Sequence, residues 1–174
     1  MRRIEKRAGL CLLLVLLFTG QLVLHALSTS ATTDEPLHLL AGHRYLACGD
    51  FAFNPEHPPL LKAMAAVPLQ AMDVRMPEGL SCAPGFIPKA EAFRLGAEFM
   101  QTNGQDRILV PARLMAMLPA IALALLVWAL AWRMFGGWCA VGTMALLAME
   151  PVLVAHGSLV TTDMVITTTT LLVV

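Results

Sequence analysis

The sequence predicts an all-α protein, a polytopic membrane helix bundle with amphipathic interfacial helices in its first outer loop. Its 174 residues are 57% hydrophobic and only 14% charged, and the mean hydropathy is +0.70. Long apolar runs alternate with segments that hold most of the charges, as in membrane proteins. The net charge is zero, and no basic patch or nucleic-acid motif occurs in the sequence. We therefore expect a bilayer partner and no nucleic-acid partner.

The first predicted membrane helix covers about residues 9–27. A basic head precedes an apolar run that holds no acid and no permanent base. Such a run is either a cleaved signal peptide or an uncleaved helix. It is longer than the roughly 7 to 15 residues of a signal-peptide core, and no small-x-small cleavage site follows it. These observations favour the uncleaved helix.

Three more apolar runs follow, at 108–132, at 136–155 and from about residue 161. The first two are long enough to span a bilayer. Arg113 lies near the start of the 108–132 run, where we expect its side chain to snorkel to the interface. The last run reaches the final residue after about 18 Å of helix, roughly half a hydrocarbon core. We therefore expect an N-terminal fragment or a truncated gene product that is inactive by itself.

Basic residues near the spans predict the orientation in the plasma (inner) membrane. Positive charge concentrates on the cytoplasmic side of membrane helices. It occurs here before the first helix and at Arg133, between the second and third helices. The N-terminus is then cytoplasmic, and the segment 28–107 lies outside, together with the turn around residues 156–160.

The outer segment 28–107 contains three predicted short helices, at 34–48, 58–72 and 89–100. The first has an apolar stripe at helical spacing, and the second opens with two prolines suited to a first turn. Helices of this kind between membrane spans pack along the interface. Cys48 and Cys82 lie in the same segment. They form a disulfide if the segment faces an oxidising compartment, or they remain two unrelated thiols.

Polar side chains gather in four clusters on the predicted outer side. They are Asp34 with Glu35; Glu56, His57 and Lys62; Glu150; and His156 with Asp163. Acids at helix starts have an ordinary explanation as caps that also favour the helix dipole. That explanation applies to the Asp34–Glu35 pair and to Asp163. Glu150 is either an interfacial carboxylate or a group facing a cavity or partner, because an acid within a membrane run is costly.

The stretch "NPEHPPLLKAM" at 54–64 is the densest of these clusters. Pro58 and Pro59 fix a helix start whose free amides, with Lys62 on the next turn, make a place for a phosphate. A metal site would draw instead on Glu56, His57, His38, His43 and Asp163. However, His38 and His43 are separated by roughly 140° around a helix, which is poor spacing for joint ligation.

These motifs together resemble a known family. The pair "DE" at 34–35, "HPPLLK" at 57–62 and "EP…AHG…TTDM" at 150–164 resemble the protein O-mannosyltransferases, glycosyltransferase family 39. The wider group of GT-C membrane enzymes includes the aminoarabinose–lipid A transferases and other enzymes that use polyprenyl-phosphate sugars. The resemblance extends over about residues 28–164.

The resemblance implies a role for each motif residue. Asp34 matches the family's proposed catalytic base, and Glu35 completes that motif. Glu56 matches a metal-holding glutamate of the aminoarabinose branch, so a divalent metal ion is a possible cofactor, and Asp163 matches an acid at the start of the fourth helix. His57 replaces a phosphate-binding lysine of that branch and matches the mannosyltransferase branch. With Lys62 it would contact the carrier phosphate.

The implied activity is the transfer of a sugar from a polyprenyl-phosphate-linked donor to a hydroxyl of a protein, lipid or glycan acceptor. Two alternatives differ from a protein-modifying enzyme. One is a related transferase acting on lipid A or on envelope glycans. The other is a non-catalytic membrane protein, or an inactive truncated remnant, whose polar loop only packs and solvates.

Overall fold

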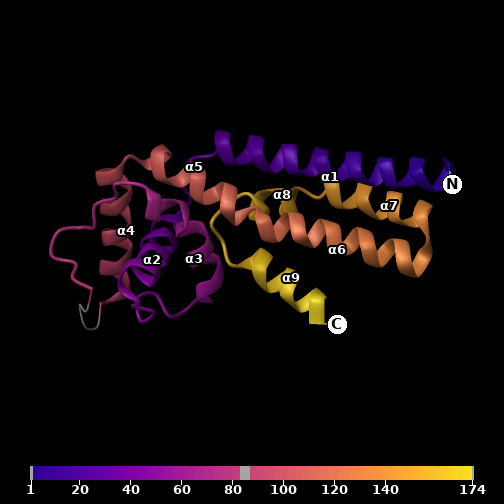
Figure 1. The fold of residues 1–174 in the computed structure, drawn as a ribbon. Coiled ribbons are helices and arrows are strands. Elements are labelled where there is room, and N and C mark those ends of the chain that lie inside the picture. Colours follow the sequence, from indigo (N-terminus) through magenta and orange to yellow (C-terminus); the bar gives the residue numbers. More distant parts are fainter. Residues whose placement is uncertain (1, 83–86, 174) are drawn as a thin grey trace. The chain divides into compact units, whose positions relative to one another are not determined.

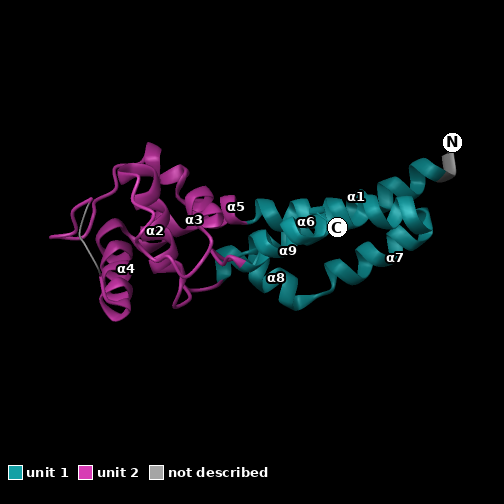
Figure 2. Ribbon diagram, turned by 90° about the horizontal axis from the view of Figure 1, so that it is seen from below, with its two compact units in different colours: residues 1–28, 117–158, 163–174 teal, residues 29–116, 159–162 magenta. Residues whose placement is uncertain are grey.

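The structure, a computed structural model, describes residues 2–82 and 87–173, so residues 83–86 of the predicted outer segment lie outside it. Within the described ranges every regular element is helical, which confirms the predicted all-α class. The chain divides into two compact units. Unit 1 comprises residues 1–28, 117–158 and 163–174, and unit 2 comprises residues 29–116 and 159–162 (Figure 2, teal and magenta).

The described residues of unit 1 form the helices α1 (Arg2–Ser28), α6 (Leu118–Phe135), α7 (Gly137–Ala148), α8 (Pro151–Gly157) and α9 (Asp163–Val173) (Figure 1). The buried face of α1 repeats every three or four residues, at Cys11, Val15, Phe18 and Leu22. Alanines and methionines of α6 and α7 complete this core. Small residues let helix backbones approach closely, as is usual between membrane helices.

Among the residues that the structure describes, two helices are long and apolar enough to cross a membrane, Ile4–Ser28 and Gln105–Phe135. The second is formed by α5 (Gln105–Ala116) and α6 in succession. The outward face of α1 leaves large leucines exposed, among them Leu13 at 61% and Leu24 at 69%. A continuous apolar surface of this kind is unfavourable in water. Together these features indicate a membrane protein.

The prediction of one continuous helix over 136–155 is wrong. The segment forms α7 and α8, which are bent by 66° at the break between them. Pro151 explains the break, because proline donates no backbone hydrogen bond and disfavours helical geometry in the preceding residue. Glu150 accordingly has an extended backbone, with φ −84° and ψ 105°. If the bent pair counts as one span, the described chain has up to three.

Unit 2 contains α2 (Glu35–Cys48), α3 (Pro59–Ala66), the 3₁₀ helix η1 (Pro68–Ala71), α4 (Lys89–Asn103) and α5. Helices thus occur in all three places where the sequence predicted them. Two glycines allow close packing on α2. A Cβ on Gly42 would lie 1.9 Å from the carbonyl oxygen of Lys62 in α3, and one on Gly96 would lie 2.8 Å from the amide of Leu37.

Cys48 and Cys82 form a disulfide, which answers the question that the sequence left open. The bond joins the end of α2 to the loop that precedes α4. Beside it, an Arg44 Nη1–H donates to the carbonyl oxygen of Ser81 (2.8 Å). Disulfides of this loop length typically stabilise a fold by about 2–4 kcal/mol, and they persist in oxidising compartments.

We expect Gly42→Ala to destabilise unit 2. The added methyl group meets main chain rather than a flexible side chain, so α3 must move away from α2, at a cost of about 1–3 kcal/mol. Gly142→Ala is the control, because that helical position has nothing within 4 Å and alanine favours helix by roughly 1 kcal/mol. Thermal unfolding of the two variants should shift in opposite directions. Equal shifts would contradict the close contact.

Candidate functional site

The neighbouring acids Asp34 and Glu35 have opposite environments. Glu35 is fully buried, whereas Asp34 is exposed. The Glu35 carboxylate accepts hydrogen bonds from Arg113 Nε–H (2.9 Å) and Nη2–H (2.7 Å). It also accepts bonds from the backbone amides of Val160 and Thr32, both at 2.9 Å, and from the Thr32 hydroxyl at 3.1 Å. Both carboxylate oxygens of Glu35 are therefore fully hydrogen-bonded, and the role of this side chain is structural.

The pKa of Glu35 reflects this set of donors. Burial alone would raise it, but the hydrogen bonds from Arg113, Thr32 and Val160, with the charge of Arg113, outweigh burial and hold the pKa below its usual range. The carboxylate is thus charged at neutral pH. An ionised carboxylate whose oxygens already accept several hydrogen bonds is a poor proton acceptor. Glu35 is therefore less suited than Asp34 to act as a base.

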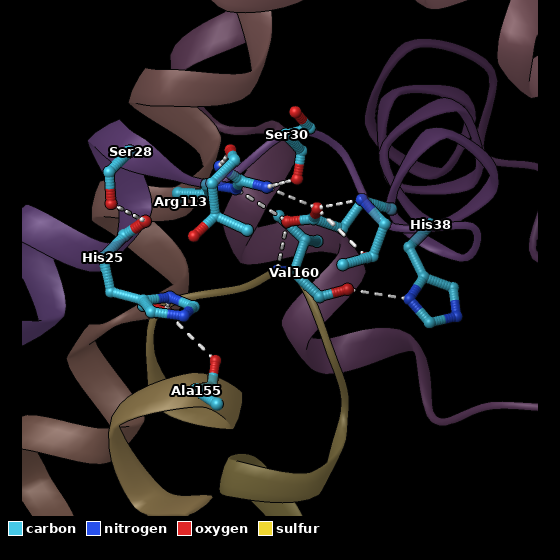
Figure 3. Close-up of polar contacts among 11 residues, drawn as sticks. His25, Ser28, Ser30, His38, Arg113, Ala155 and Val160 are labelled. Atoms are coloured by element: carbon cyan, nitrogen blue, oxygen red, sulfur yellow. Dashed lines mark hydrogen bonds and ion pairs between the residues drawn. The ribbon is translucent and has the colours of Figure 1, made fainter. Parts of the chain in front are cut away.

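Arg113 is 1% exposed, so the prediction that it snorkels to the interface is wrong. In addition to Glu35, it donates to the carbonyl oxygens of Thr29 (2.7 Å) and Ser30 (3.0 Å) (Figure 3). These partners replace the hydrogen bonds that water would make with the guanidinium, so the charged side chain is stable in its buried position. Arg113 and Glu35 together join α5, the start of α2 and the segment that precedes it.

Val160 is held by two side chains of α2. Its amide donates to Glu35, and its carbonyl oxygen accepts from His38 Nδ1–H (2.8 Å) (Figure 3). Glu35 and His38 are three residues apart and hence lie on the same face of a helix. Residues 159–162 are in this way fixed to α2. No local sequence pattern indicates this contact, because 122 residues separate His38 from Val160.

His38 presents a free nitrogen beside this contact. Since its partner is a carbonyl oxygen, Nδ1 must carry the proton. Burial lowers the pKa of His38, which favours the neutral ring with an unprotonated Nε2. No hydrogen bond from another described residue reaches Nε2, and the centroids of the His38 and His57 rings are 5.0 Å apart in an edge-on arrangement. The sequence suggests His38 only as a poorly spaced metal ligand. It indicates neither the hydrogen bond to Val160 nor the unprotonated Nε2.

Asp34 occupies the N-cap position of α2, but its side chain makes no capping hydrogen bond. The interpretation of Asp34 as a side-chain cap is therefore wrong. Its backbone carbonyl accepts the first helical bond, from the amide of His38 (2.9 Å). The exposed carboxylate remains available to an incoming group.

Lys62 fixes the loop that carries Glu56 and His57. Its buried ammonium donates to the main-chain oxygen (2.7 Å) and side-chain oxygen (2.8 Å) of Asn54. Asn54 has a left-handed backbone, with φ 55°, a conformation that asparagine tolerates better than most residues. The phosphate-binding role of Lys62 stays a prediction, and it requires this buried ammonium to become accessible.

The surface of the same loop is polar and open. Glu56 and His57 are exposed. Glu56 forms an ion pair with Lys89 (2.7 Å), and the hydrogen bond from Lys89 lowers the pKa of Glu56. Lys89 is a cation beside the predicted site that sequence reasoning missed. His57 remains a candidate phosphate contact.

The other candidates lie in unit 1. Glu150 is exposed and caps α8, where its Oε1 accepts from the amide of Val152 (3.2 Å). His156 Nδ1 and Asp163 Oδ2 are 3.0 Å apart, and both side chains are about half exposed. At the end of α1, His25 Nδ1 lies 2.7 Å from Ser158 Oγ, which donates to the carbonyl oxygen of Ala155 (3.0 Å) (Figure 3).

The predicted metal ligands have other partners in the structure. Glu56 is paired with Lys89 and Asp163 with His156. Among residues 2–82 and 87–173, no group of three or more His, Cys, Asp or Glu side chains is arranged to hold a metal ion.

Comparison of the chain with protein-family models, curated proteins and solved structures finds no match.

We expect Glu35→Gln to destabilise the protein strongly, by about 3–5 kcal/mol, because it leaves the buried Arg113 charge without its counter-ion. The neighbouring change Asp34→Asn removes an exposed carboxylate that makes no cap hydrogen bond, and it should shift stability by less than about 0.5 kcal/mol. Denaturation of both variants at pH 7 checks this. Similar losses in the two would show that Glu35 has no special structural role.

We expect the free energy of unfolding to rise with pH above about 8, because the pKa of Lys62 is lower in the folded chain than in the unfolded chain. Burial lowers the pKa of Lys62 to about 8, against about 10.4 in an unfolded chain. Between these values the unfolded state holds a proton that the folded state has released, so raising the pH favours folding. Lys62→Met should flatten the slope, whereas Lys89→Met, at an exposed lysine, should not.

The measurement is chemical denaturation from about pH 7.5 to 9.5. It stops there because burial, with the charge of Asp50, raises the pKa of Tyr45 to about 12. That shift lowers stability once an unfolded tyrosine ionises near pH 10. A flat profile in the unmodified chain would contradict the assignment to Lys62.

Proposed function

We propose that the protein is a membrane glycosyltransferase of the GT-C type, similar to glycosyltransferase family 39, with Asp34 as its catalytic base. The observation that carries the proposal is the environment of Asp34. An exposed carboxylate without a cap bond lies at the start of a helix whose next residue is locked by a buried ion pair. A base needs this combination of a free acceptor and a fixed backbone.

The reaction is a displacement at the anomeric carbon. Asp34 takes the proton of the acceptor hydroxyl while the hydroxyl oxygen forms a bond to that carbon. The bond from the carbon to the phosphate oxygen breaks, and its electron pair stays on the lipid phosphate. Cationic groups stabilise the developing charge. His57 and Lys89 are exposed in the same unit, and Lys62 can join them if it leaves Asn54.

The proposed location is the outer face of the plasma (inner) membrane, with several spans and a cytoplasmic N-terminus. The lipid tail of a polyprenyl-phosphate sugar stays in the bilayer, so its headgroup reaches an enzyme site at the interface. The Cys48–Cys82 disulfide supports this placement of unit 2, because disulfides persist in oxidising compartments. The acceptor is a hydroxyl of a protein, a lipid A or an envelope glycan.

A non-catalytic membrane protein is the second candidate. It is favoured by the internal satisfaction of the charges at Glu35, Arg113 and Lys62, which together stabilise the fold without any ligand. The two candidates differ in what Asp34 does, so a substitution there separates them.

We expect Asp34→Asn in the complete gene product to lower turnover by about 10²–10⁴-fold, the usual contribution of a general base. Asparagine keeps the shape of the side chain but accepts no proton, so expression and melting temperature should stay near wild type. Transfer from polyprenyl-phosphate mannose, assayed in native membranes, is the measurement. Asp106→Asn is the control, at another exposed acid in the first turn of a helix. Wild-type turnover of Asp34→Asn would refute the role as base.

We expect an impermeant thiol reagent applied to intact cells to modify a cysteine at position 81 and not one at position 135. Both native side chains are exposed, Phe135 at 67%, so membrane sidedness rather than burial decides the result. The variants Ser81→Cys and Phe135→Cys are made in a chain whose native cysteines are replaced by serine. The reverse pattern of labelling would overturn the orientation.

A further inference from the structure

Unit 1 has an apolar groove outside every candidate site residue discussed above. It is lined by Ala8 of α1 and by Leu125, Trp128, Ala129 and Trp132 of α6, and its volume is about 350 Å³. Trp128 and Trp132 are one helical turn apart, as are Leu125 and Ala129, so the lining forms two adjacent rows on α6. The two alanines leave room between larger side chains. The volume is within the usual range for a ligand site.

Cationic residues adjoin the lining residues in sequence, and one of them, Arg7, lies near the Trp132 ring. Lys6 and Arg7 directly precede Ala8, and Arg133 directly follows Trp132. A Cβ built on Gly137 would lie 2.8 Å from Arg7 Cδ and 3.1 Å from the Trp132 ring, so these two side chains approach the same point. The Arg7 guanidinium lies over the Trp138 ring, 5.1 Å from its centre.

These cations are not neutralised within the part of the chain that the structure describes. None of its ion pairs includes Lys6, Arg7 or Arg133. Lys6 and Arg133 are exposed, and the acid nearest to them in sequence, Glu5, is exposed as well. The groove therefore combines an apolar lining, two indole rings and unpaired positive charge.

We propose that this groove is a binding site for an anionic phospholipid. The acyl chain would lie against Trp128, Ala129 and Leu125, and the phosphate would meet Arg7 and Arg133. Tryptophan favours the membrane interface. Arginine binds phosphate through paired hydrogen bonds, and basic groups beside membrane helices attract anionic headgroups. A zwitterionic headgroup adds a positive charge beside three others, so it fits less well. The proposal does not depend on glycosyl transfer.

The test uses tryptophan fluorescence of the purified chain in phosphatidylcholine vesicles that contain a minor share of phosphatidylglycerol. Bromine atoms, which quench indole fluorescence on contact, are placed on the chains of the phosphatidylglycerol or of the same mole fraction of phosphatidylcholine. Trp138→Phe leaves the two groove tryptophans as the only emitters. Each surface cation contributes about 1 kcal/mol of attraction, about fivefold in affinity. We therefore expect brominated phosphatidylglycerol to quench several-fold more per mole.

Two variants of this Trp138→Phe chain, with a third as control, separate the headgroup from the tail. Arg7→Gln with Arg133→Gln should reduce the preference to near parity, whereas Arg107→Gln, an exposed arginine of unit 2, should keep it. Ala129→Leu fills the groove without changing charge, so it should lower quenching by phosphatidylglycerol by at least about half.

Equal quenching by the two lipids in the parent chain would overturn the proposal. So would weak quenching by both, as expected if a protein segment covers the groove, or no effect of Ala129→Leu.

Discussion

The buried ion pair between Glu35 and Arg113 is the constraint on which unit 2 depends. Two opposite charges with side chains 0% and 1% exposed lie 2.7 Å apart. Removing them from water costs several kcal/mol per ion, so every remaining donor and acceptor must be satisfied. The partners come from residues 29–32 and from Val160, and these segments are therefore fixed by the same charges. A buried ion pair contributes little net free energy of folding compared with apolar side chains. It favours one arrangement of these segments, because any other leaves a buried charge without its partner.

The same constraint assigns different tasks to the two acids of the "DE" motif. Successive residues of a helix point about 100° apart, so a helix that buries Glu35 turns Asp34 away from the core. The observed exposure agrees with this geometry. In the proposed reaction, Glu35 would act only by positioning α2 and Val160. Asp34, whose side chain makes no cap hydrogen bond, would accept the proton.

Helices were predictable from the sequence, and their polar connections were not. Apolar periodicity and the prolines at 58 and 59 indicate helices close to α2 and α3. The break at Glu150 was missed because the apolar run continues across Pro151. Arg113 was misinterpreted because its partner is 78 residues away. No local pattern reports a contact of that range. The contact of His38 is equally unpredictable from the sequence. Its partner is a backbone carbonyl, and every residue has one.

The loop "NPEHPP" shows how buried polar contacts can serve a site that they do not themselves form. Lys62 binds two oxygens of Asn54, and the Tyr45 hydroxyl donates to the carbonyl oxygen of Phe53 (2.9 Å). These bonds hold the backbone on either side of the left-handed Asn54. Glu56 and His57 therefore extend to solvent from a loop that is already ordered. Binding to a pre-organised loop avoids the entropy cost of ordering it. In the proposed enzyme, the buried Lys62 would thus favour ligand binding by Glu56 and His57 while its own ammonium donates to Asn54.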